Sequence, residues 1–345
     1  MKTFWISSDD FARLVERWAK ETELYALRYS QGELHYQKVE DGIQGDGIVY
    51  DMVRAVEPLK SFFFKVKEEV ARYPSPAPEG LKEPGPRIIL GAKACDLKSL
   101  EILDGVFTAG EFMEPYYIAN RKNTTLISSD CSSPKESCFC TLMGISPYPS
   151  SGFDLNLSVI PSVIPSGLLV EVGSKKGAEI LDSSLLREAT SSEIEERDRN
   201  RETTLTKVKA QNERFSFRRS YQEIVKEGMT SPLWEEMARR CLGCAACTII
   251  CPTCHCFLLY DQRADEEFER IRVWDFCYYR GFARVGGGAN PRPRMSDRFK
   301  NRYIHKFDFF PENFGVYGCT GCGRCIEACL AGIDIREVFR ELQAT

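Results

Sequence analysis

Two stretches of the chain decide how its C-terminal part is built: CLGCAACTIICP at residues 241–252 and CTGCGRCIEAC at residues 319–329. Both have the cysteine spacing C-x2-C-x2-C-x3-C. The two-residue gaps let a tight loop wrap three thiolates around one cubane cluster, and the fourth cysteine then ligates the neighbouring cluster. The pattern therefore predicts two [4Fe–4S] clusters that exchange their fourth ligands.

The exchange defines a ligand set for each cluster. The first set is Cys241, Cys244, Cys247 and Cys329, and the second is Cys319, Cys322, Cys325 and Cys251. Leu330 stands where the pattern usually has a proline, but that residue binds no metal and the assignment is unaffected. Structural zinc sites use pairs of CxxC and do not require a third and a fourth cysteine at this spacing. Two such runs favour clusters over zinc or unliganded thiols.

Composition indicates a soluble protein with more than one domain. The chain has 345 residues, of which 43% are hydrophobic, and a net charge of −4, which gives no reason to expect nucleic acid as a partner. The stretch MKTFWISSDDFARLVERWAK does not resemble a secretion signal, and no apolar run is long enough to span a membrane. Fifteen cysteines without a secretion signal point to metal ligation rather than disulfides. We expect a cytoplasmic protein of anaerobic metabolism.

The chain upstream of the two runs has the pattern of an α/β protein. Residues 1–72 contain a helix, DDFARLVERWAK, that starts after Ser7, and a hairpin, LYALRYSQGELHYQKV, that turns at Gln31 and Gly32. A proline-rich connector, YPSPAPEGLKEPGP, follows. Residues 87–190 then repeat strand, turn and helix, with RIILGA, TTLISSD and GLLVEV as the strands. This repetition predicts a mixed, partly parallel sheet.

Two further segments complete the predicted domain organisation. Residues 191–230 are highly charged and predict a helical linker. Residues 231–345 carry both cysteine runs, separated by segments of helical appearance such as DQRADEEFERIRVWDF and NRYIHKFDFF. This arrangement resembles the α-helical ferredoxin domains in subunits of fumarate reductases and heterodisulfide reductases. The predicted fold class is an α/β N-terminal domain followed by an α-helical, ferredoxin-like dicluster domain.

Four more cysteines lie in the α/β region. Cys95 follows the strand RIILGA and Cys131 follows TTLISSD, and ligands in open α/β folds gather where strands end. The loop SSPKESCFC returns Cys138 and Cys140 to the same edge. These four thiolates predict a third [4Fe–4S] cluster, and the alternative is that they are buried apolar thiols.

The last three cysteines, Cys254, Cys256 and Cys277, allow several interpretations. They can complete a further site, donate a ligand to the third cluster, or pack beside the clusters. His255 lies between the first two, and we expect it to form hydrogen bonds rather than ligate iron. Basic residues in NPRPRMSDRFKNRYIHKF (290–307) would stabilise a reduced cluster or form a solvated helical face, and the sequence does not single out one of them.

The order of the motifs resembles one family. GAKACDLKSLEILD, YYIANRKNTTLISSDC, CFC, SGFDLNL, CPTCHCF, NPRPRMSDR, IHKF and CTGCGRCIEAC occur in the order seen in the iron–sulfur beta subunits of cytosolic sulfhydrogenases and the A subunits of anaerobic sulfite reductases. The resemblance implies a hetero-oligomeric complex with a flavoprotein subunit that oxidises NAD(P)H. It also implies a catalytic redox partner of the hydrogenase, sulfite reductase or heterodisulfide reductase type.

We therefore expect an electron-transfer subunit that relays single electrons and has no catalytic residues of its own. One alternative is an enzyme that reduces sulfur, polysulfide or a disulfide at an open iron site. A second alternative is a regulatory protein that senses redox state through cluster loss, but no effector module is visible in the sequence.

Overall fold

The computed structural model describes residues 2–40, 47–74, 84–160 and 166–344. Its larger sheet has eight strands in the order β3-β2-β5-β6-β7-β8-β1-β9. Their bounds are β1 Thr3–Ser7, β2 Glu23–Ser30, β3 Glu33–Lys38, β5 Arg87–Ala92, β6 Thr124–Ser129, β7 Leu155–Ile160, β8 Gly167–Val172 and β9 Arg187–Glu188. Strands β2, β5, β6 and β7 run parallel and the outer pairs are antiparallel, so the predicted partly parallel sheet is confirmed.

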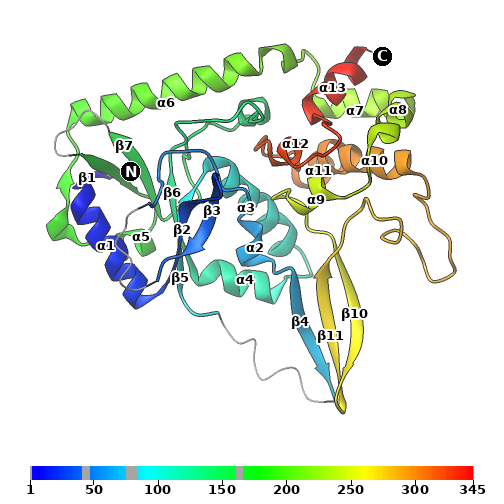
Figure 1. The fold of residues 1–345 in the computed structure, drawn as a ribbon, viewed down its shortest axis with the longest axis horizontal. Helices are drawn as coiled ribbons and strands as arrows, with labels where there is room; N and C mark the ends of the chain where they lie inside the picture. The colour runs from blue at the N-terminus through cyan, green and yellow to red at the C-terminus, as the bar shows by residue number, and fades with distance from the viewer. Residues whose placement is uncertain (1, 41–46, 75–83, 161–165, 345) are drawn as a thin grey trace.

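Helices cover both faces of this sheet (Figure 1). Helix α1 (Ser8–Glu21) buries its apolar side chains on one face together with alternate residues of the strands. Helices α3 (Ala94–Phe107) and α4 (Pro115–Lys122) cover the other face, with short α2 (Lys60–Phe63) beside them. Strands from residues 1–72 and from residues 87–190 thus share one sheet and two common cores. Helix α5 (Lys175–Ile180) follows β8.

Several local predictions are confirmed. Ser7 caps α1, because its hydroxyl accepts a hydrogen bond from the Asp10 amide at 3.1 Å. The hairpin of β2 and β3 turns at Gln31 and Gly32, both with positive φ, as a tight two-residue turn requires. Residues 75–83 of the proline-rich connector lie outside the described residues.

The charged stretch that we predicted as a helical linker contains the long helix α6 (Ser191–Gln211), which runs along one side of the molecule from the sheet to the C-terminal helices (Figure 1). Arg197 and Arg201 of α6 form ion pairs with Glu171 on β8, at 3.1 Å for Arg197. The helix is therefore fastened to the sheet over part of its length.

The C-terminal part is built mainly from short helices. They are α7 (Tyr221–Glu227), α8 (Leu233–Arg240), α9 (Ala246–Ile249), α10 (Met295–Ile304), α11 (Phe310–Phe314), α12 (Arg324–Glu327) and α13 (Ile335–Ala344). A π-helical turn, His305–Phe309, connects α10 to α11. These helices share one aromatic-rich core that includes Trp234, Tyr303 and Phe339. Among the described residues no helix is long and apolar enough to cross a membrane.

One expectation for this part is wrong. The segment DQRADEEFERIRVWDF is not helical: β10 (Phe257–Ala264) and β11 (Glu267–Trp274) form an antiparallel hairpin there. β11 also pairs with β4 (Lys67–Tyr73), so that three strands project from the body of the molecule (Figure 1). The pairing with β4 satisfies the backbone of β11, and a buried ion pair between Arg272 and Glu68, at 2.5 Å, supports it. Tertiary contacts thus override the helical appearance of the charged sequence.

Candidate iron–sulfur centres

The two cysteine runs form tight loops that precede short helices. Helix α8 ends at Arg240 and delivers Cys241 to the first loop, where Gly243 and Ala245 both have positive φ. In the second loop Gly321 and Gly323 have φ of 63° and 77°. Such left-handed residues turn the backbone so that its N–H groups can point inward.

The first run and the last cysteine of the second run converge. Burial raises the pKa of Cys241, and Cys329 and Cys244 lie close enough to raise it further. Cys247 has Cys241 and Cys329 as charged neighbours. The amide of Ile333 donates a hydrogen bond to the sulfur of Cys329 at 3.3 Å. These four cysteines, Cys241, Cys244, Cys247 and Cys329, are called group 1; Cys244 is its exposed member.

The second run gathers around the last cysteine of the first. Burial raises the pKa of Cys319 to about 12, and Cys325 and Cys251 act on it as neighbouring charges. The Gly321 amide donates to the sulfur of Cys319 at 3.5 Å, and the hydroxyl of Thr253 lies 3.3 Å from the sulfur of Cys251. These contacts resemble the hydrogen bonds that tune cluster potentials. Group 2 consists of Cys319, Cys322, Cys325 and Cys251.

The cysteines of the α/β region form a third set. Burial raises the pKa of Cys140, and Cys138 and Cys131 contribute as neighbouring charges. Cys95 likewise has Cys322 and Cys140 as charged neighbours. Group 3 consists of Cys95, Cys131, Cys138 and Cys140. As predicted from the ends of β5 and β6, the strand ends and the CFC loop lie at one edge.

Groups 2 and 3 are packed directly against each other. The Phe139 amide donates to the carbonyl of Gly321 at 2.7 Å, and the sulfur of Cys138 lies 3.9 Å from the carbonyl oxygen of Cys322. A Cβ atom at Gly321 would stand only 2.5 Å from the Phe139 oxygen. The glycine is therefore required both by its positive φ and by this close approach.

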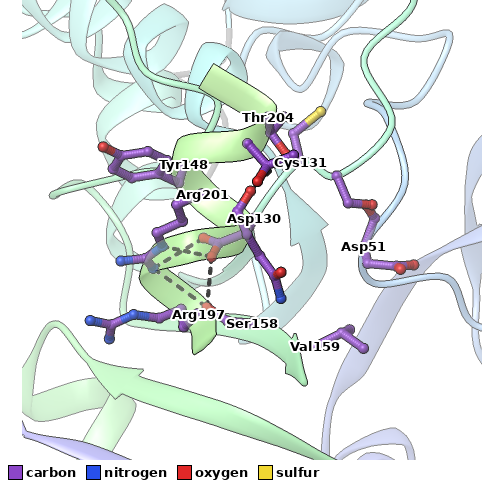
Figure 2. Close-up of a pocket in the computed structure, with 12 residues that line it drawn as sticks. Asp51, Asp130, Cys131, Tyr148, Ser158, Val159, Arg197, Arg201 and Thr204 are labelled. Carbon is purple, nitrogen blue, oxygen red and sulfur yellow. Dashed lines mark hydrogen bonds and ion pairs between the residues drawn. The ribbon is translucent and has the colours of Figure 1, made fainter. Parts of the chain in front are cut away.

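Group 3 also borders a pocket of about 270 Å³ between the sheet and α6. Figure 2 shows Cys131, Tyr148 and the α6 arginines around it, with Arg201 directed at Asp130. Arg201 donates to Asp130 at 2.7 Å and its guanidinium stacks on the Tyr148 ring at 4.9 Å. Since Arg201 and Arg197 are already paired with carboxylates, the pocket has no strong excess of positive charge.

The three remaining cysteines lie in two places. Cys254 is next to Cys251, and a hydrogen bond from it holds the pKa of Cys251 well below the ordinary value. Cys256 and Cys277 are neighbours of each other. His255 packs against Phe107, and burial lowers its pKa to about 4, so it is neutral at physiological pH. The structure assigns none of these three cysteines to a complete ligand set.

Buried cations beside the cysteine groups show whether the surroundings of these groups suit anionic clusters. Arg302, Lys306 and Lys60 are buried, and within the described residues no carboxylate lies within 4.0 Å of any of them. Their charged neighbours are cysteines instead. A buried charge without a counter-ion is costly, so thiolate-bound clusters of negative charge suit these positions. Arg302 and Lys306 belong to the basic run of residues 290–307, in which the sequence could single out neither because burial is not visible there. Lys60 lies outside that run, and no signal in the sequence marked it.

The cysteines form no disulfides: all fifteen are free thiols. In the part of the chain that the structure describes, no three His, Cys, Asp or Glu side chains come close enough together to hold one ion.

Two comparisons agree with this chemistry. Residues 240–333 match the family model of a 4Fe-4S dicluster domain, a range that contains all eight cysteines of groups 1 and 2. The chain is 34% identical over 303 residues to the protein named sulfhydrogenase 2 subunit beta from Pyrococcus furiosus, and the alignment covers 86% of each chain. The chain belongs to the family of sulfhydrogenase beta subunits, iron–sulfur electron-transfer proteins with two [4Fe–4S] clusters in a C-terminal dicluster domain.

Proposed function

We propose that this chain is the iron–sulfur relay of a hetero-oligomeric complex, passing single electrons between a flavoprotein subunit that oxidises NAD(P)H and a catalytic redox subunit. The catalytic partner would be of the hydrogenase, sulfite reductase or heterodisulfide reductase type. The name of the Pyrococcus furiosus relative, a beta subunit, supports membership of such an assembly. A bound [4Fe–4S] cluster supplies a one-electron store.

The residues of the chain would hold the clusters, exclude water and set the potentials. Group 1 would hold one cluster and group 2 its neighbour, with Cys251 and Cys329 as the exchanged ligands. Group 3 would hold a third cluster at the edge of the sheet. Lys93 would balance its charge, because Cys131 is the leading anionic neighbour of this buried lysine, ahead of Asp130.

One observation carries the proposal: neighbouring groups lie close to each other. Cys247 of group 1 has Cys251 of group 2 as a charged neighbour. Between groups 2 and 3, the Phe139 amide donates to the carbonyl of Gly321 at 2.7 Å. Electron tunnelling falls steeply with distance, so a relay needs neighbouring centres. The closeness of the three groups, which come from two parts of the chain, therefore supports a relay.

Iron and acid-labile sulfide per anaerobically purified chain test the proposal. About twelve iron atoms support three clusters, and about eight contradict the third. Cys138→Ser should lower the count by about four if group 3 binds a cluster, because it removes one of four ligands. Ser137→Ala changes the neighbouring side chain but no ligand, and it should leave the iron content unchanged.

The pocket beside Cys131 favours a second candidate, a reductase of sulfur, polysulfide or a disulfide at an open iron site. The pocket would give a small molecule a path to group 3. Turnover of such a substrate by the purified subunit alone, supplied with an artificial electron donor, would support this candidate. No turnover under the same conditions would favour the relay.

A further inference from the structure

Arg302 is buried between the two cysteine groups of the dicluster domain. It is 5% exposed and lies on α10 (Met295–Ile304), within the basic stretch before the second cysteine run. No carboxylate pairs with it among the described residues, and its Nε atom has no hydrogen-bond partner there. The side chain is thus a desolvated cation whose counter-ion must come from something other than an acidic residue.

The anionic neighbours of Arg302 belong to both groups. Burial alone would lower its pKa, but the thiolates of Cys247 in group 1 and Cys325 in group 2 hold that pKa well above the ordinary value. Arg302 in turn is the cation that acts on Cys241 and Cys247. A single guanidinium therefore faces both members of the dicluster.

Lys306 is placed differently. It follows Arg302 by four residues, which puts the two side chains on the same face of the continuous helix. It is 3% exposed, and its ammonium donates to the hydroxyl of Thr253 and to the carbonyl of Gly318, both at 2.8 Å. Its leading charged neighbours are Cys251, Cys254 and, in group 2, Cys319. The leading anionic neighbours of the lysine thus lie in group 2 and at Cys254.

We propose that Arg302 stabilises the reduced state of both dicluster centres, whereas Lys306 stabilises only the centre held by group 2. Reduction adds one negative charge to a centre, and a nearby cation lowers the energy of that charge, most strongly where water is excluded. Arg302 therefore shifts both reduction potentials upward together. Lys306 raises only the potential of the centre held by group 2 and thereby sets the difference between the two reduction potentials. The inference rests on the proposed iron–sulfur function of the chain.

Redox titration of the anaerobic holoprotein, followed by electron paramagnetic resonance, measures the potentials directly. Arg302→Gln keeps a polar, though shorter, side chain but removes the charge, and it should move two potentials to more negative values. Arg302→Lys keeps the charge and should restore most of the shift. Lys306→Gln should move one potential and leave the other in place. Arg240→Gln removes an exposed charge next to Cys241, and it should move none because water screens that charge.

Iron content is measured first for every variant. A wild-type chain without clusters would contradict the proposed function itself. If clusters are present but Arg302→Gln moves only one potential or none, or if Lys306→Gln moves two equally, the inference is wrong while the relay stands. If Arg302→Gln loses its clusters, Arg302→Lys and Lys306→Gln still test the inference. A shift of both potentials in Lys306→Gln would overturn the inference, and a shift of one potential would support it.

Discussion

Asp96 and Arg324 form an ion pair that joins the second cysteine run to helix α3, and Asp96→Ala removes one half of it. Arg324 lies between Cys322 and Cys325, and Asp96 lies next to Cys95 on α3. The two side chains are 1% and 0% exposed, and Nη1 is 2.7 Å from Oδ1. The variant therefore leaves a buried guanidinium without its carboxylate.

The size of the effect follows from what remains around Arg324. Breaking a buried ion pair by removing one partner costs about 3–5 kcal/mol of stability. Arg324 still donates to the carbonyl oxygens of Ala55 and Val56, both at 3.1 Å, and these bonds partly solvate the charge. We therefore expect a loss near the lower limit, roughly 3 kcal/mol, for Asp96→Ala.

Urea unfolding of the anaerobic holoprotein measures this loss, with iron content as a second reading. The pair Asp96→Leu and Arg324→Met removes both charges, and it should cost less than Asp96→Ala because no charge stays buried. Glu179→Ala serves as the control, since its pair with Lys175 is mostly exposed on both sides and should contribute under about 1 kcal/mol. A loss below about 1 kcal/mol for Asp96→Ala, or a double variant as unstable as the single one, would refute the reasoning.

Three further changes have defined outcomes. Gly321→Ala should lower the stability by roughly 2–4 kcal/mol and reduce the iron content, because Gly321 has positive φ and an added Cβ would clash with Phe139. Gly332 has the same φ but nothing lies within 4 Å of an added Cβ, so Gly332→Ala should lower the stability by only about 1 kcal/mol. Equal losses of stability for the two variants would contradict this reasoning. Burial lowers the pKa of His305 to about 4, so the folded protein favours the neutral imidazole. The stability that this preference gives is lost as the pH falls from about 6.5 toward 4, and the loss is roughly 2 kcal/mol at pH 5. Thermal unfolding of His305→Gln should show a smaller loss of stability over the same pH range. Cys244→Ala should lose about four iron atoms while the circular dichroism of the sheet is kept, and an unchanged iron count would remove Cys244 from the ligands.

The sequence predicts the sheet of this protein because its signals are local. Buried strands such as RIILGA are short apolar runs, and RIILGA is followed at once by helix α3. Cys95 and Cys131 could be placed at one edge because parallel strands end on the same side. Spacing alone likewise brought out groups 1 and 2, since the loop geometry of a cubane depends on residues close together in the chain.

Features that depend on distant contacts were not predictable in this way. β11 looks helical by composition and becomes a strand because it pairs with β4, which lies far upstream. The choice of Arg302 among many arginines depends on burial, which the chain acquires only on folding. The proximity of groups 2 and 3 is equally invisible, because Gly321 meets Phe139 only in the folded molecule.

Contacts that run in both directions hold groups 2 and 3 at a fixed separation. Arg54, from the N-terminal part, donates to the carbonyl of Cys322 at 2.5 Å and pairs with Glu327 at 2.7 Å. Arg324, from the dicluster domain, reaches back to Asp96 beside group 3. Both arginines are buried, so moving either one away would leave its charge buried without its partner or would expose the loop that it contacts. The distance on which electron transfer between the two groups would depend is thus set by paired charges across the interface. The end of helix α6 contributes as well, because Asn212 donates to the carbonyl of Cys138 and accepts a hydrogen bond from Arg336 of the dicluster domain.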